Sequence, residues 1–208
     1  MTAPPLVFVI DDDASVRSSL KFLLSTVGLQ AETFDSADSF LHKKRPDVPS
    51  CLVLDVRLPG VSGIDFQREL TARNISIPIV FLTGHGDIPM SVRAMKAGAV
   101  EFLTKPFRDQ DLLDAVRVAL DRDRTRREHE TELADIRRRF DSLTSREQEV
   151  LSMVMNGMLN KQIAAELGTA ESTVKVQRSR AMEKMQAESL AHLIKMMQKL
   201  QLPSQKAS

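Results

Sequence analysis

Acidic residues that could bind a divalent cation stand at the ends of two predicted strands. Asp11 and Asp12 directly follow the apolar run Leu6–Ile10, and Asp55 directly follows the apolar run 51–54. Short runs rich in Val, Ile and Leu are typical of strands that are buried on both faces of a parallel sheet. The carboxyl ends of such strands meet at one edge, where open α/β sheets bind their ligands. We therefore expect the three carboxylates to lie together.

Two further polar residues follow other predicted strands, Thr83 after residues 77–82 and Lys105 after residues 100–103. Three crowded carboxylates repel one another, and their oxygen atoms suit a hard cation, Mg²⁺ first and Mn²⁺ as the alternative. With that cation on the phosphoryl oxygens, Asp55 could attack phosphorus, while Thr83 and Lys105 bind the remaining oxygens. No glycine-rich nucleotide loop is evident, so we expect a phosphorylated partner to be the donor.

The elements that must position these residues alternate between strand and helix. Apolar spacing predicts strands at 6–10, 31–34, 51–54, 77–82 and 100–103, and helices at 16–27, 37–44, 64–72, 91–97 and 109–120. Neighbouring parallel strands need crossover connections, and helices supply them. The pattern therefore predicts an α/β fold, a doubly wound five-stranded parallel sheet of the flavodoxin-like kind.

Residues 124–141 differ in composition from the segments on either side. They are mostly charged and contain neither Gly nor Pro, which favours a helix. Leu133, Ile136 and Phe140 form an apolar stripe that fits a solvated linker or the start of a coiled-coil seam. The stripe is shorter than a coiled coil needs. We interpret the segment as a charged helical linker.

The remaining residues predict a small all-α domain, 142–208. Residues 138–208 hold 11 basic and 7 acidic side chains, against 29 and 28 in the whole chain, so this part is basic and the preceding part acidic. A short helix over 160–167, a turn with Gly168 and a longer helix over 171–185 form a helix-turn-helix pattern. The longer helix has one apolar and one basic side, which suits the major groove of double-stranded DNA. Taken by itself, however, a basic side indicates only a soluble surface helix.

The acidic residues belong to a set of motifs at characteristic separations. The set comprises Val-Ile-Asp-Asp-Asp at 9–13, Asp55 with Pro59-Gly60, Thr83-Gly84, and Lys105-Pro106-Phe107. Together they resemble the receiver domain of two-component response regulators over about residues 5–123, and we expect the domain to span residues 1–123. The segments 83–90 and 95–99 resemble the FixJ-type subgroup.

The resemblance implies a role for each residue of the acidic site. Asp55 is the expected phosphoacceptor, and Lys105 contacts the phosphoryl group. Asp12 and Asp55, with the backbone carbonyl of Arg57, are the expected ligands of Mg²⁺, and Asp11 assists through water. Thr83 and Phe102 are the expected switch pair.

The C-terminal motifs at 143–151, 160–164 and 172–175 resemble the LuxR/NarL-type helix-turn-helix. This resemblance implies that the protein binds DNA as a dimer and that a last helix over 190–200 forms the dimer contact. The expected DNA contacts are Lys161, Thr173, Lys175, Val176, Gln177, Arg178, Arg180 and Lys184. The expected dimer residues are Leu190, Leu193, Ile194 and Met197. Gln177 and Ser179 depart from residues common in relatives, so base preference cannot be transferred.

The sequence thus predicts a transcriptional regulator switched when a sensor histidine kinase phosphorylates Asp55, and a homodimer when phosphorylated. We expect a cytoplasmic protein without a membrane segment, because no apolar run approaches about 20 residues. One alternative is a constitutive DNA binder whose receiver is an interaction scaffold. The other is an Asp-dependent phosphohydrolase, which usually needs a second Asp where this chain has Arg57, so we do not expect a dedicated enzyme.

Overall fold

A computed structural model describes residues 4–84 and 88–201 of the 208-residue chain. The chain divides into two compact units, with the boundary after Arg127. Residues 85–87 of the predicted motif 83–90, and the outer ends of both predicted domains, lie outside the described residues.

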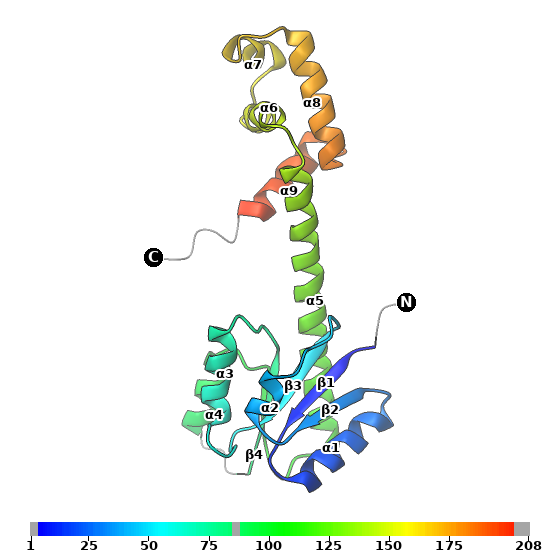
Figure 1. The fold of residues 1–208 in the computed structure, drawn as a ribbon, viewed down its shortest axis with the longest axis vertical. Helices are drawn as coiled ribbons and strands as arrows, with labels where there is room; N and C mark the ends of the chain where they lie inside the picture. Colours follow the sequence, from blue (N-terminus) through cyan, green and yellow to red (C-terminus); the bar gives the residue numbers. More distant parts are fainter. Residues whose placement is uncertain (1–3, 85–87, 202–208) are drawn as a thin grey trace. The chain divides into compact units, whose positions relative to one another are not determined.

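The first unit is built on a five-stranded parallel sheet with the strand order β2-β1-β3-β4-β5 (Figure 1). This arrangement confirms the predicted fold class. Its strands are β1 (Leu6–Ile10), β2 (Gln30–Phe34), β3 (Ser50–Asp55), β4 (Ile79–Thr83) and β5 (Glu101–Thr104). Its helices are α1 (Ala14–Thr26), α2 (Ala37–Leu41), α3 (Gly63–Ala72), α4 (Ile88–Lys96) and the first part of α5 (Asp109–Asp141).

Successive side chains of each central strand enter opposite hydrophobic cores. In β1, Val7 and Val9 pack with residues of α1 and α5, whereas Phe8 and Ile10 pack with residues of α2, α3 and α4. The Phe8 and Phe40 rings meet edge to face, with their centroids 5.4 Å apart. Because both faces are covered, every residue of β1 and β3 is buried, which explains the continuous apolar runs in the sequence.

Helix α3 begins unusually close to the end of β3. Its N-cap is Ser62, whose hydroxyl accepts a hydrogen bond from the Ile64 amide at 3.3 Å. A Cβ atom on Gly63 would lie 2.4 Å from the backbone oxygen of Asp55, far inside van der Waals contact. Gly63 therefore allows the helix to approach the strand end that carries Asp55.

Helix α5 is a single helix where the sequence predicted a helix over 109–120 and a separate linker helix. Asp123 lies beyond the predicted helix end, yet it is only 1% exposed. It accepts a hydrogen bond from the Ser50 amide at 2.9 Å and pairs with Arg126 and Arg127, each at 2.6 Å. These three donors offset the free-energy cost of burying the Asp123 carboxylate. The pattern of charges in the sequence does not reveal that Asp123 is buried and bonded to Ser50.

The second unit contains the rest of α5 and four further helices, α6 (Ser145–Met155), α7 (Asn160–Glu166), α8 (Glu171–Met185) and α9 (Leu190–Gln201). Val150, Ile163 and Val174 form one core, which joins α6, α7 and α8. Ile136 is 4% exposed and belongs to a second core with residues of α6, α8 and α9. Within the predicted charged helical linker, Ile136 is therefore a core residue and not a solvated one. Within the described ranges, no helix is long and apolar enough to cross a membrane.

Glu147 ties the start of α6 to the end of α8. Its side chain accepts hydrogen bonds from the Thr144 amide at 2.8 Å and from the Lys184 ammonium at 2.7 Å. Thr144 in turn accepts from the Glu147 amide, which completes a capping box. The hydrogen bond from Lys184, followed by that from Thr144, holds the pKa of Glu147 below its ordinary value of 4.5.

We expect Gly63→Ala to lower the free energy of unfolding of the first unit by about 1–3 kcal/mol, since the added methyl group overpacks the contact between α3 and β3. The measurement is urea unfolding, followed through the amides of β3 by hydrogen exchange in the full chain. Gly84→Ala is the control, because no described atom lies within 4 Å of its Cβ position. Equal stability of the two variants would contradict the close approach of Gly63 to the backbone of Asp55.

We expect Glu147→Gln to lower the stability of α6 by about 1–2 kcal/mol at neutral pH, because a hydrogen bond to a charged group is lost. A lowered carboxyl pKa stabilises the fold above pH 4.5, and this contribution disappears as the pH falls through the folded-state pKa. The difference between wild type and variant in hydrogen exchange of α6 should therefore shrink below pH 4.5. A difference that stays constant with pH would show that the charge of Glu147 is immaterial.

Candidate functional site

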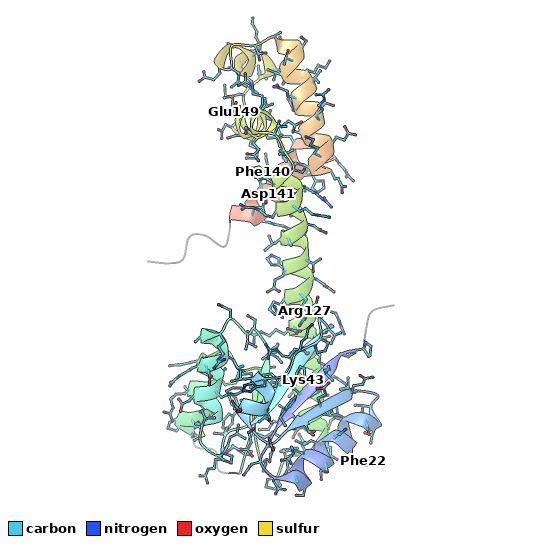
Figure 2. All side chains as sticks on the ribbon, viewed as in Figure 1. Phe22, Lys43, Arg127, Phe140, Asp141 and Glu149 are labelled. Carbon is cyan, nitrogen blue, oxygen red and sulfur yellow. The ribbon has the colours of Figure 1, made fainter. Side chains whose placement is uncertain are left out.

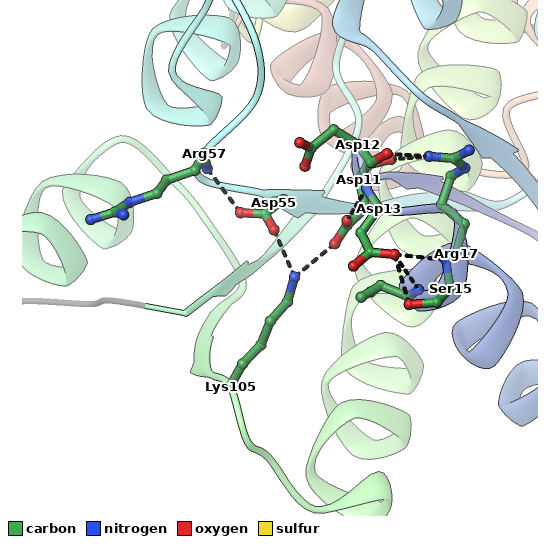
Figure 3. A network of polar contacts seen from close by, with 9 residues as sticks. Asp11, Asp12, Asp13, Ser15, Arg17, Asp55, Arg57 and Lys105 are labelled. Atoms are coloured by element: carbon green, nitrogen blue, oxygen red, sulfur yellow. Dashed lines mark hydrogen bonds and ion pairs between the residues drawn. The ribbon is translucent and has the colours of Figure 1, made fainter.

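The predicted acidic residues converge at the carboxyl edge of the sheet. Asp11 directly follows β1 and Asp55 is the last residue of the neighbouring strand β3, so their side chains meet (Figure 3). Asp11 and Asp55 are buried, and Asp12 is exposed. One oxygen atom from each of the three carboxylates lies within 4.8 Å of the other two.

Lys105 reaches this cluster from the loop after β5. Its ammonium lies 2.7 Å from Oδ2 of Asp11 and 2.6 Å from Oδ2 of Asp55. Burial raises the pKa of Asp11 above its ordinary value, although Lys105 and the Asp13 amide act against this. Burial alone would lower the pKa of Lys105, but the hydrogen bonds to Asp11 and Asp55 outweigh it and raise the pKa. Lys105 is thus an ammonium that offsets part of the negative charge of the pair.

The loop after β3 orients Asp55. The amide of Arg57 donates a hydrogen bond to Oδ1 of Asp55 at 2.8 Å, while Lys105 holds Oδ2. Arg57 also forms a backbone bridge with Ser62, which precedes α3. Arg57, whose carbonyl is an expected metal ligand, therefore lies directly beside the Asp55 carboxylate.

The donor chemistry of this cluster fits a hard divalent cation. Carboxylate oxygens at such mutual distances are the ligands that Mg²⁺ and Mn²⁺ prefer. Asp11, Asp12 and Asp55 are the carboxylates that would hold the ion. Its positive charge would also relieve the repulsion among them.

The predicted switch pair occupies neighbouring strands. Thr83 ends β4 and is fully buried, and its backbone oxygen accepts a hydrogen bond from the Lys105 amide at 2.7 Å. Phe102 lies on β5 and is half-buried, with its ring centroid 6.1 Å from that of Phe81 on β4. Thr83 therefore contacts the backbone of Lys105 from β4, and Phe102 lies on β5, the strand that leads to Lys105.

The expected DNA contacts all lie in the second unit, and they differ in how far their side chains are exposed. Val176 is 49% exposed on α8. Four basic or polar residues are also exposed, namely Lys161, Thr173, Lys175 and Arg180. Gln177 and Arg178 are half-buried, and Arg178 donates to Asn160 on α7 at 3.1 Å. The Lys184 ammonium is engaged within the unit by Glu147.

The predicted dimer residues of α9 lie largely inside their own unit. Leu193 is 0% exposed, and Met197 is buried beside it in the core that contains Ile136. Leu190 and Ile194 are half-buried. The apolar face of α9 was expected to meet a second chain, but the structure covers Leu193 and Met197 with residues of the same chain.

Sequence reasoning missed Arg17, which lies beside the acidic cluster. Arg17 on α1 contacts the loop that carries Asp11 and Asp12. Nothing in the sequence shows where the long Arg17 side chain points. Ser172 and Ser179, which belong to the segments considered in the sequence, are exposed on the same side of α8 as Val176.

Comparison with known proteins assigns a family to each of the two units. Residues 7–117 match the model of the response regulator receiver domain, and residues 141–197 match that of bacterial regulatory proteins of the luxR family. The chain is 58% identical over 195 residues to nodulation protein W of Bradyrhizobium diazoefficiens, which covers 94% of this chain and 86% of that protein. It is 44% identical over 190 residues to the transcriptional regulatory protein FixJ of Azorhizobium caulinodans, covering 91% and 90%.

Solved structures give the same result. The low-resolution structure of the response regulator StyR matches with a TM-score of 0.87 at 53% identity, covering 95% of this chain and 100% of that one. Full-length FixJ from B. japonicum matches with a TM-score of 0.56 at 38% identity, covering 96% and 98%. The chain therefore belongs to the response regulators of two-component systems, and it joins a receiver domain to a luxR-type DNA-binding domain.

Proposed function

We propose that the protein regulates transcription through DNA binding that is switched when a sensor histidine kinase phosphorylates Asp55. The observation that carries the proposal is the Asp55 carboxylate, held between the Lys105 ammonium and the Arg57 amide beside two further aspartates. An oriented carboxylate beside an ammonium that can pair with phosphoryl oxygens suits nucleophilic attack on phosphorus.

In the proposed reaction, a carboxylate oxygen of Asp55 forms a bond to the phosphorus of a phosphohistidine. The phosphorus–nitrogen bond breaks, and its electron pair returns to the imidazole of the donor. Lys105 already lies 2.6 Å from Asp55, so its ammonium can pair with the transferred phosphoryl oxygens. A bound Mg²⁺ would neutralise the remaining negative charge.

Thr83 and Phe102 would then transmit the change. The new phosphoryl charge attracts the Thr83 hydroxyl at the end of β4, and the adjacent Phe102 side chain takes a new position on β5. Such a movement shifts an equilibrium between two arrangements of the surface formed by β5 and α4.

A cavity beside Lys105 suits docking of the kinase. It has a volume of about 670 Å³ and is lined by one side of α1 and by Lys105, Pro106 and Phe107. Phe22, which Figure 2 labels on α1, lines this cavity. It is 72% exposed. A partner bound here would place its phosphohistidine next to Lys105 and Asp55.

The apolar row on α4 is a surface for a second copy of the phosphorylated chain. Ile88, Val92 and Met95 recur at helical spacing and are exposed, with Ile88 at 80%. Lys96 at the end of α4 and Glu101 on β5 are exposed and opposite in charge. A twofold axis would therefore match apolar row to apolar row and pair these charges.

In the DNA-binding unit, the side of α8 that bears Lys175, Val176 and Arg180 would enter the major groove. Val176 offers an apolar contact for a thymine methyl group, and Lys175 and Arg180 can reach bases or phosphates. Lys184 is better assigned to the ion pair with Glu147. Two chains bound to two half-sites would gain affinity through avidity.

We expect a small phosphodonor such as acetyl phosphate, with Mg²⁺, to increase sequence-selective DNA binding of the wild-type chain, and Asp55→Asn to abolish the increase because an amide is a poor nucleophile. Selection from a genomic fragment library measures this effect. Asp65→Asn serves as control, since Asp65 is an exposed residue of α3. Equal binding with and without the donor would favour the constitutive alternative, and absence of DNA binding would refute the proposal.

We expect Phe22→Ala to slow phosphoryl transfer from the kinase about tenfold or more, while phosphorylation by acetyl phosphate stays unchanged, because only the protein donor needs the docking surface. Val118→Ala on α5 is the control, since Val118 is also an exposed apolar residue. The measurement is the rate of radiolabel transfer from phosphorylated kinase. If transfer from both donors slowed equally, Phe22 would be needed for the structure of the phosphorylation site and not for docking of the kinase.

A further inference from the structure

Arg17 contacts the loop that carries the acidic residues. Its Nη1 atom donates hydrogen bonds to the backbone oxygens of Asp11, at 2.7 Å, and of Asp12, at 2.9 Å (Figure 3). Asp13, the next residue of the loop, caps α1 by accepting a hydrogen bond from the Ser15 amide at 2.7 Å. The start of α1 thus holds the loop at two points, a side-chain cap and a guanidinium.

These two carbonyl contacts fix the direction of the Asp12 side chain. The Asp11 carbonyl belongs to the peptide plane before the Asp12 Cα atom, and the Asp12 carbonyl to the plane after it. Since peptide units are planar, holding both carbonyls restricts both backbone dihedrals of Asp12 and therefore its Cα–Cβ direction. Asp12 is exposed, and no hydrogen bond to its carboxylate is found among the described residues. Its placement near Asp11 and Asp55 depends on its backbone.

We propose that Arg17 is a positioning residue for divalent-cation binding, which it promotes by holding the Asp11–Asp12 backbone so that both carboxylates face Asp55. The inference rests on the cation site of the proposed function. Arg17 touches neither the cation nor the phosphoryl group in this role. It acts through the two carbonyl oxygens of the loop.

The charge of Arg17 has the opposite effect on cation binding. A guanidinium close to the site repels Mg²⁺, so removing that charge alone would strengthen binding. Removing the hydrogen bonds loosens three consecutive carboxylates that repel one another, and this weakens binding. The two roles therefore predict changes of opposite sign in the dissociation constant for Mg²⁺.

The test is calorimetric titration of MgCl₂ into the full chain without phosphodonor. We expect Arg17→Met to weaken Mg²⁺ binding about tenfold, as loss of a residue that orients metal ligands typically does. Arg17→Lys retains the charge and a donor, and should recover part of the affinity. Arg117→Met is the matched control, because Arg117 is an exposed arginine of α5 that pairs with Asp114 on the same helix. It should bind Mg²⁺ as the wild type does.

A melting temperature measured without Mg²⁺ separates this role from a purely structural one, which would lower stability and leave the dissociation constant unchanged. Wild-type or tighter Mg²⁺ binding by Arg17→Met overturns the inference, as long as Asp55→Asn weakens binding in the same assay. If Asp55→Asn leaves Mg²⁺ binding unchanged, the cation site of the proposed function fails as well. Should Arg17→Met not fold, the decision passes to Arg17→Lys, where unchanged affinity overturns the inference.

Discussion

The first unit must hold three carboxylates close together although they repel one another. Asp11, Asp12 and Asp55 lie within one small region although like charges at such distances oppose one another. The parallel sheet makes this arrangement possible, because β1 and β3 are neighbours and end at the same edge. Lys105 makes it stable, since one ammonium bridges the two buried carboxylates. A further anion or cation at the site will therefore change how Lys105 and the three carboxylates interact.

The fold and the main site residues could be predicted from the sequence because burial on both faces leaves a strong signal. Strands such as β1 and β3 are continuous apolar runs, and the polar residue that ends each run must lie at the sheet edge. The boundaries predicted for β1 and α8 agree with the structure. The start of α4 was predicted at Ser91, three residues after its observed start at Ile88. The observed helix includes Pro89, which a first turn tolerates because its backbone nitrogen needs no helical partner there.

Contacts made by long side chains and by the backbone could not be predicted in this way. Arg17 and Asp123 lie in charged or amphipathic segments, where periodicity indicates solvent, yet each is bound to backbone atoms of another segment. The same limit applies to the second unit. Periodicity shows that α9 has an apolar face, but not whether residues of its own chain or of another chain cover it. Leu193 and Met197 are covered by their own unit.

Charge has different physical uses in the two units. Glu147 and Lys184 form a fixed internal pair, which stabilises the helical unit and leaves the exposed cations of α8 to a ligand. In the receiver, by contrast, Lys105 is shared between two carboxylates. Phosphorylation of Asp55 would add about −1.5 to −2 charges at one of them, as phosphoryl groups do. Lys105 must then divide its interactions differently, and its amide is bonded to Thr83 on β4. Through one lysine, a change of charge at the site would thus reach β5, which precedes Lys105, and the end of β4, which leads to α4. This connection supports the proposed effect of phosphorylation on a surface away from the site.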